Sequence, residues 1–164
     1  DLAIGVGPDS ARTAGVHSKP LGHITFVYAV APHHPLASAP EPLSDEVIQK
    51  HRAVAVADSI SRGAGQTFGL LSGQDVFTVP DMASKLEAQL RGLGGGFLPE
   101  SLARPYIESG LLVAKTVQKP RTSTGHYAWR DSKQAPAGQA LRWWLSQLER
   151  PATRNALLQP AHRV

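Results

Sequence analysis

A short polar segment carries the side chains in this sequence that are best suited to holding an anion. It reads Asp58-Ser59-Ile60-Ser61-Arg62 and follows a run of apolar residues. The two serine hydroxyls and the arginine guanidinium are able to clamp a carboxylate or a phenolate, because charged donors make the strongest hydrogen bonds to such groups. Two other interpretations stay open: Asp58 pairs with Arg62 within the segment, or the segment is a solvated polar loop.

A second group of residues marks the start of a helix. The sequence Thr78-Val79-Pro80-Asp81-Met82 predicts that Thr78 caps this helix, with Pro80 in its first turn and Asp81 reaching back as in a capping box. Free N–H groups and the positive end of the helix dipole attract anions at such a position. The alternative interpretation is a capped helix with a methionine in the core.

Two further motifs have the residue types of a binding site but the wrong geometry for one. His33 and His34 are adjacent in an extended segment, so their side chains point in opposite directions and do not chelate one ion together. The glycines between Gly92 and Gly96 follow a helix and precede a strand, whereas a dinucleotide-binding loop runs from strand to helix. We interpret the histidines as structural, and the glycines as a helix C-cap followed by close backbone packing.

Composition excludes several classes of site. The chain of 164 residues has no cysteine, which excludes disulfides, thiolate chemistry and cysteine zinc sites. No carboxylate pair, Ser-His-Asp ordering or phosphate loop stands out, so we expect no enzyme, no cofactor and no metal. The net charge is +4, but the lysines and arginines are scattered, and we expect no direct DNA contact from this chain. The longest apolar run, residues 24–31, is too short to cross a bilayer.

The elements that position these residues follow from hydrophobic patterning and from the breakers proline and glycine. We expect strands over 2–4, 24–31, 52–57, 75–78, 95–98, 111–117 and 126–130. We expect helices over 45–50, 81–91, 100–108 and 137–148, with Pro151 ending the last one before a frayed tail. Residues 8–22 read as a loop and residues 118–125 as a turn. The alternation of strands and helices favours an α/β fold with a mixed or parallel sheet.

Five strings, taken in order and spacing, resemble one family across roughly residues 1–149. They are Asp1-Leu2-Ala3-Ile4-Gly5, the segment 26–37 that contains His-Pro-Leu-Ala, the helix start 78–86, the segment 90–99 that ends in Leu-Pro, and Glu108-Ser109-Gly110-Leu111-Leu112-Val113. The sequence is similar in these strings to the effector-binding domain of LysR-type transcriptional regulators. The pairing of the second string with the fourth, about 60 residues apart, is the most specific part.

The resemblance implies a two-lobed α/β fold like that of type 2 periplasmic binding proteins. Measured against the family pattern, the first strand–helix–strand–helix of lobe I is absent, so lobe I is expected to be incomplete in this chain. Residues 1–25 would then form the end of lobe I and the first crossover. Residues 26–113 would form lobe II, and residues 114–164 would form the second crossover and the C-terminal part of lobe I.

The resemblance also implies a function, which is to sense a small organic effector held between the lobes and so to control DNA binding by a separate helix-turn-helix domain. A solute-binding receptor of a transporter with the same fold is the alternative. The family's habit is to bind aromatic or organic acids, to self-associate as a dimer or tetramer, and to work in the cytoplasm without contact with a membrane. DNA would be reached only through an N-terminal domain that is absent from this sequence.

Mapped onto this sequence, the family's effector cleft would be lined by residues near the strand ends. Some relatives carry a cation at position 6, where this chain has Val6, and this difference argues against an acidic effector. Gly5 and Gly7 have a hinge or turn as their alternative role. The expected effector-binding residues are Val6, Gly7, Asp58, Ser59, Ser61, Arg62, Thr78 and Met82.

Overall fold

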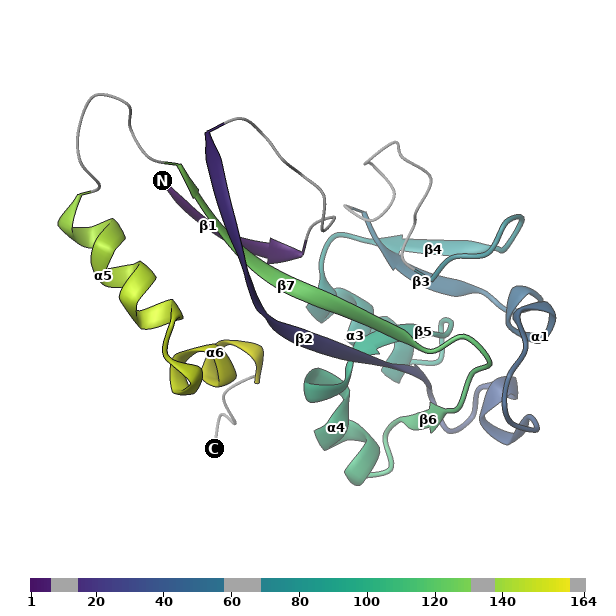
Figure 1. Ribbon diagram of the computed structural model, residues 1–164. Coiled ribbons are helices and arrows are strands. Elements are labelled where there is room, and N and C mark those ends of the chain that lie inside the picture. The colour runs from purple at the N-terminus through teal and green to yellow at the C-terminus, as the bar shows by residue number, and fades with distance from the viewer. Residues whose placement is uncertain (7–14, 58–68, 131–137, 160–164) are drawn as a thin grey trace. The chain divides into compact units, whose positions relative to one another are not determined.

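The chain folds into two compact units, shown together in Figure 1. The computed structural model describes residues 1–6, 15–57, 69–130 and 138–159. The first unit combines residues 1–24 with residues 122–164, and the second unit is the continuous stretch 25–121. The chain therefore passes from one unit to the other twice, at 24–25 and at 121–122, within the long strands β2 (Val16–Val30) and β7 (Arg121–Arg130).

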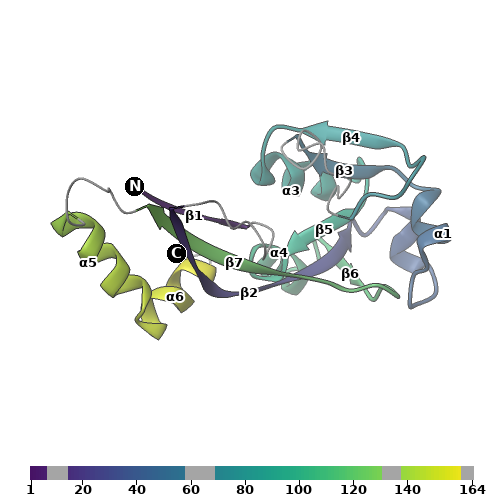
Figure 2. The ribbon, with the colours of Figure 1, turned by 45° about the horizontal axis from the view of Figure 1, so that its top comes forward.

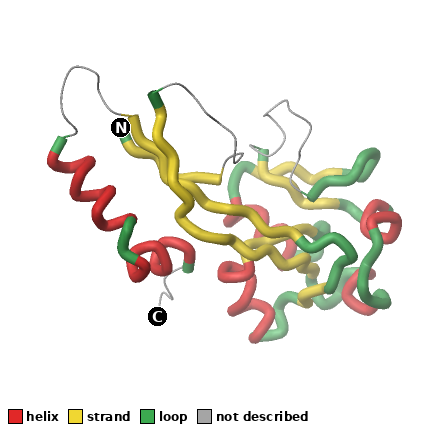
Figure 3. The backbone as a smooth tube through the Cα atoms, in the orientation of Figure 1, coloured by secondary structure: helices red, strands yellow, loops and turns green. Residues whose placement is uncertain are grey.

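The first unit is a small antiparallel sheet with two helices. Strand β1 (Leu2–Val6) pairs antiparallel with β7, with Leu2 opposite Trp129, and β7 lies between β1 and β2 in the strand order. Helices α5 (Gln139–Leu148) and α6 (Pro151–Leu158) follow, drawn in red in Figure 3. Leu21, Tyr127 and Leu148 come from β2, β7 and α5 and form the buried core of this unit. The core thus joins residues more than 120 positions apart in the sequence.

The second unit combines an antiparallel part with a parallel part. The end of β2 pairs antiparallel with β5 (Gly96–Pro99) and with β6 (Val113–Lys115). Strand β3 (Ala53–Val56) pairs in parallel with β4 (Val76–Val79), and a parallel bridge joins Ala53 to Gly95, just before β5. The remaining elements are the 3-10 helix η1 (Pro35–Ser38) and the helices α1 (Asp45–Gln49), α3 (Met82–Leu90) and α4 (Glu100–Glu108).

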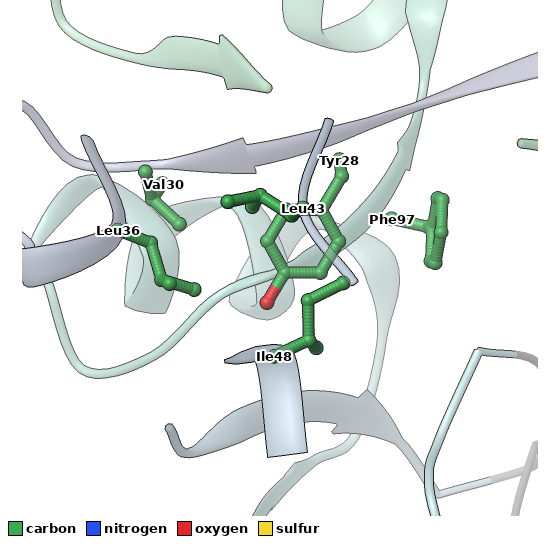
Figure 4. Packing of buried hydrophobic residues seen from close by; sticks show 6 residues of the cluster. All are labelled: Tyr28, Val30, Leu36, Leu43, Ile48 and Phe97. Carbon is green, nitrogen blue, oxygen red and sulfur yellow. The ribbon is translucent and has the colours of Figure 1, made fainter. Parts of the chain in front are cut away.

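Two larger buried clusters, and a smaller one between α3 and the β3–β4 pair, hold the second unit together. Figure 4 shows the first cluster, in which the ring of Tyr28 packs among aliphatic side chains and meets Phe97 edge-on at 5.3 Å between ring centroids. Burial raises the pKa of the Tyr28 phenol, whose buried hydroxyl has no hydrogen-bond partner in the part of the chain that the structure describes. The second cluster takes Ala29 from β2, Leu98 from β5, Leu86 from α3 and Ala103 from α4, and Leu112 just before β6 completes it. Together they fix α3 and α4 against the sheet.

Three element predictions were wrong at their ends. Residues 16–22, expected as part of a loop, belong to β2, and residues 121–125, expected as part of a turn, belong to β7. These polar stretches are strands because they lie next to each other in the sheet, a long-range pairing that local hydrophobicity does not reveal. Pro151 was expected to end a helix before a frayed tail, but it begins α6, since proline suits the first turn of a helix.

Candidate functional site

The parallel pair β3–β4 ends at one edge of the second unit, and most of the described candidate residues lie there. Val56 is opposite Val79, and the N–H of Ala57 donates to the carbonyl of Val79 at 2.9 Å. Figure 2 shows α3 beside this pair, which it contacts along with β5. The carboxyl ends of β3 and β4 and the first turn of α3 are therefore neighbours, which is where open α/β sheets bind ligands.

The start of α3 is capped by a different residue from the one predicted. The carboxylate of Asp81 accepts a hydrogen bond from the N–H of Ser84 at 2.7 Å, and Asp81 is the N-cap of the helix. Thr78 is not the cap, because it still belongs to β4, where it is exposed and lies opposite Ala55. Hydrogen bonds from the Ser84 backbone and side chain lower the pKa of Asp81. One N–H group that was expected to be available for an anion is thus occupied by the protein's own carboxylate.

Met82 packs in the core and also lies at the candidate site, so it fits both interpretations of this residue. It is half-buried and packs against the core cluster that contains Leu86 and Leu98. It is also the first residue of α3, directly after the Asp81 cap, and therefore lies at the same edge as the ends of β3 and β4. The side chain is thus anchored in the core while part of its surface remains accessible at the candidate site.

The other predicted site residues divide between the first unit and the part of the chain that is not described. Val6 ends β1 in the first unit, where it is opposite Gly125. Gly7, Asp58, Ser59, Ser61 and Arg62 lie outside the described residues. The residue before Asp58 is Ala57, whose hydrogen bond to Val79 holds it at the edge of β3 and β4. The structure therefore brings Thr78 and Met82 together with the residue from which the 58–62 segment departs.

Two polar residues on the buried face of α3 were missed by the sequence analysis. Lys85 is 6% exposed and Gln89 is fully buried. Burial lowers the pKa of the Lys85 ammonium to about 8, and among the described residues neither the amide nitrogen nor the amide oxygen of Gln89 has a hydrogen-bond partner. The available signal was their spacing: they are four residues apart and share a helix face with the apolar Met82 and Leu86. Polar side chains are seldom buried on an apolar helix face, so the burial of Lys85 and Gln89 calls for a physical explanation.

The glycines between α3 and β5 have the structural roles that were predicted for them. Gly92 has a φ of 73° just after α3, a conformation that glycine adopts without strain. A methyl group on Gly94 would lie 2.6 Å from the carbonyl oxygen of Arg52, and one on Gly95 would lie 2.6 Å from the hydroxyl of Tyr28. These distances confirm the interpretation as a helix end followed by close packing.

The adjacent histidines differ in their surroundings. The Nδ1 atom of His34 accepts a hydrogen bond from the N–H of Leu36 at 3.1 Å and so caps η1. Burial lowers the pKa of His34, and the neighbouring rings of His51 and His33 lower it further. The ring of His33 instead lies against Gly92, where a methyl group would come within 2.2 Å of Nε2. His34 therefore has a capping role in this fold.

Comparison with known proteins assigns the chain to a family. The family model described as LysR substrate binding domain matches residues 1–150, and the chain belongs to this family. The uncharacterized HTH-type transcriptional regulator YeeY of Escherichia coli is 36% identical over 148 residues, which are 90% of this chain and 47% of YeeY. The HTH-type transcriptional activator AllS of Klebsiella pneumoniae is 39% identical over 115 residues, which are 70% of this chain and 43% of AllS. The chain thus spans just under half the length of these curated relatives.

Solved structures show the same fold at lower identity. The regulatory domain of MetR, a LysR family regulator from N. meningitidis, matches with a TM-score of 0.70 at 18% identity, covering 98% of this chain and 72% of that domain. Full-length LysG from Corynebacterium glutamicum with bound effector arginine matches with a TM-score of 0.61 at 19% identity, covering 97% of this chain and 52% of LysG. The fold is that of LysR regulatory domains, a periplasmic-binding-protein-like α/β fold. The relatives are transcriptional regulators and not enzymes.

The described part of the chain contains only short helices. None of its helices combines the length and the apolar character that a membrane span requires. Helix α5, for comparison, has ten residues, about half the number needed.

Proposed function

We propose that this chain senses a small organic effector for a LysR-type transcriptional regulator, with its share of the effector site at the edge formed by β3, β4 and the start of α3. The observation that carries this proposal is the hydrogen bond that the N–H of Ala57 donates to the carbonyl of Val79 at that edge. It supports a site in which the exposed Thr78 and the half-buried Met82 lie near Ala57, the residue that precedes the polar 58–62 segment in the sequence. Hydroxyls, a guanidinium and an accessible thioether together suit a small molecule with one polar and one apolar part.

The segment 58–62 supplies the strongest polar groups of the proposed site. The hydroxyls of Ser59 and Ser61 and the guanidinium of Arg62 would hold an oxygen-bearing group of the effector, and Asp58 would hold Arg62 or a donor on the effector. Val6 and Gly7 are also proposed as effector-binding residues, on the basis of the family resemblance alone. The LysG structure carries arginine as its effector, which supports effector binding as a property of this fold.

The proposal extends to the protein of which this chain is a domain. Effector binding would change the equilibrium between conformations of the domain, and coupling to a separate helix-turn-helix domain would turn that change into altered DNA binding. Such a regulator works in the cytoplasm and self-associates as a dimer or tetramer. The regulators YeeY and AllS, which are about twice as long as the matched segments, support a further DNA-binding part.

The test is a thermal-unfolding screen of the chain against small carboxylates, phenols and amino acids. A ligand at 100 times its Kd adds about 2.7 kcal/mol to the free energy of unfolding, which gives a clear rise in Tm. We expect at least one compound to raise the Tm, and we expect Arg62→Ala and Thr78→Ala to reduce that rise. Ser38→Ala is the matched control, because Ser38 is an exposed hydroxyl residue in η1, away from the site.

Two results would count against the proposal. A compound whose stabilisation is unchanged in Arg62→Ala and Thr78→Ala would show an effector bound elsewhere. A screen in which no class of compound changes the Tm would contradict effector sensing by this chain.

A further inference from the structure

The inner face of α3 holds a buried cation and a buried amide at one point of the sheet. A methyl group on Gly96 would lie 2.9 Å from Nε2 of Gln89 and 3.4 Å from Cε of Lys85. Both side chains therefore lie over the first residue of β5, where the missing side chain of glycine leaves room for them. The two residues are one helical turn apart, so their polar ends converge on the same place.

Within the described part of the chain, the Gln89 amide has no hydrogen-bond partner and the Lys85 ammonium has no carboxylate partner. Both residues are buried. Buried polar groups are nearly always hydrogen-bonded, and buried charges are nearly always paired, because leaving water without a partner is unfavourable. An arrangement that carries two such groups side by side is explained if a ligand completes it.

The position of Lys85 connects this pair to the proposed effector site. Lys85 directly follows the turn of α3 that begins at Asp81 and Met82. That turn lies at the edge where β3 and β4 end. Lys85 is 6% exposed and Gln89 is 0% exposed, so a ligand would reach Lys85 before Gln89.

We propose that Lys85, supported by Gln89, recognises a carboxylate group of the effector beneath the start of α3. This assignment rests on the proposed function, since it names the chemical class of the ligand at that same site. The ammonium donates charge-assisted hydrogen bonds to the carboxylate, and the amide nitrogen of Gln89 donates a further one. The carboxylate in turn removes the unpaired charge that the folded chain otherwise carries.

The geometry favours a carboxylate over a cationic or neutral ligand. A cation would be repelled by Lys85, and a neutral apolar group would leave both Lys85 and Gln89 unsatisfied. A carboxylate is planar and small, and it offers several lone pairs to two donors that converge on one point. Lys85 would supply the positive charge that Val6 does not provide at the position where some relatives carry a cation.

The test compares matched carboxylates and amides by thermal unfolding of the chain at pH 7. The probes are acetate, succinate and benzoate, each against its amide: acetamide, succinamide and benzamide. We expect at least one carboxylate to raise the Tm while its amide does not. We expect the rise to be lost in Lys85→Met, reduced in Gln89→Leu and kept in Lys50→Met, since Lys50 is an exposed lysine at the end of α1.

The outcomes separate this inference from the proposed function. A carboxylate that stabilises the chain and Lys85→Met equally, but not Thr78→Ala, would leave the effector site standing and overturn the role of Lys85. A phenol or an amide that raises the Tm when no carboxylate does would likewise leave the effector site standing and overturn the role of Lys85. Stabilisation lost in Lys85→Met but kept in Thr78→Ala and Arg62→Ala would support the inference and overturn the proposed site. No response to any compound would overturn both.

A measurement on the unsubstituted chain covers the case in which Lys85→Met does not fold. If an ionised Lys85 holds the carboxylate, the Kd is constant near pH 7 and rises above about pH 8, approaching tenfold for each further pH unit, because burial lowers the pKa of this lysine to about 8. A Kd that is unchanged up to pH 9.5, measured by isothermal titration, would overturn the role of Lys85.

Discussion

The amide of Gln89 lies directly over Gly96, so close that a methyl group there would come within 2.9 Å of its nitrogen. On the other face of the same strand segment, the hydroxyl of Tyr28 lies over Gly95, where a methyl group would come within 2.6 Å. Two successive glycines thus make room for one polar side chain on each face of the sheet. The two glycines therefore have a packing role, and a substitution at Gly96 should change the stability of the second unit.

Gly96→Ala is expected to destabilise the second unit. The added methyl group would also lie 3.2 Å from the carbonyl oxygen of Val54, so the Gln89 side chain and the backbone of β3 both restrict it. Overpacking of this kind costs about 1–3 kcal/mol in the free energy of unfolding. Urea unfolding should therefore show a lower midpoint for Gly96→Ala.

The matched control for this substitution is Gly5→Ala. Gly5 also lies in a strand, but a methyl group there has no atom within 4 Å, so the midpoint should stay the same or rise. Combining Gly96→Ala with Gln89→Ala should restore part of the lost stability, since the shortened side chain no longer meets the methyl group. Equal midpoints for Gly96→Ala and Gly5→Ala would contradict the packing role.

Lys85 should make the stability of the chain depend on pH in the alkaline range. Burial lowers its pKa from 10.5 to about 8. Below pH 8 the lysine is charged in the folded and unfolded states alike, and its burial is unfavourable. Between pH 8 and 10.5 only the unfolded chain binds the proton, so the free energy of unfolding contributed by this group rises with pH, by up to about 3 kcal/mol.

The measurement is the difference in free energy of unfolding between Lys85→Met and the unsubstituted chain at several pH values. Lys85→Met should be the more stable at pH 7, and its advantage should shrink as the pH rises from 8 to 10.5. Other titrating groups are common to both proteins and cancel in the difference. Lys50→Met, which removes an exposed lysine, should show no such trend. An advantage that is the same at pH 7 and pH 10 would contradict the burial of a charged Lys85.

The elements that could be predicted from the sequence are those with a local signal. The apolar run at 24–31 predicted the buried end of β2, and the acidic first turn after Ser44 predicted α1. The first half of β2 and the beginning of β7 had no such signal. Their side chains are mostly polar, and what makes them strands is pairing between segments about 100 residues apart.

The candidate site also combines features that have a local sequence signal with features that depend on long-range pairing. The helix start was predicted, because proline, an acidic residue and helical spacing are local signals, whereas its position near the effector cleft was implied only by the family resemblance. The choice of Asp81 over Thr78 as the cap was not predicted, since it depends on where β4 ends, and that is set by the pairing of Val79 with Val56. Nor does the spacing of Lys85 and Gln89 reveal that they lie over a glycine of another element.

Asp81 is expected to stabilise α3 through its cap, and Thr78 is not. Asp81→Ala removes the acceptor for the N–H of Ser84 and should lower the Tm, whereas Thr78→Ala should leave the Tm nearly unchanged. Hydrogen bonds from Ser84 lower the pKa of Asp81, so this stabilisation is present above pH 3.8 and is lost as the pH falls through the lowered value. The Tm difference between Asp81→Ala and the unsubstituted chain should therefore vanish in acid. If Thr78→Ala lowers the Tm more than Asp81→Ala, the assignment of the cap is wrong.

Leu148 should be the residue of the C-terminal helices on which the first unit depends most. It is fully buried and packs with Leu21 of β2 and Tyr127 of β7, so it joins α5 to both long strands. Leu148→Ala should lower the free energy of unfolding by about 2–5 kcal/mol, because the cavity has rigid strands on its other side. Leu157→Ala in α6 is the matched control, since Leu157 is 48% exposed and its truncation should change stability little. Urea unfolding followed by tryptophan fluorescence suits this test, because Trp143 and Trp144 lie on α5 itself. Similar midpoints for the two variants would show that α5 is not held by this contact.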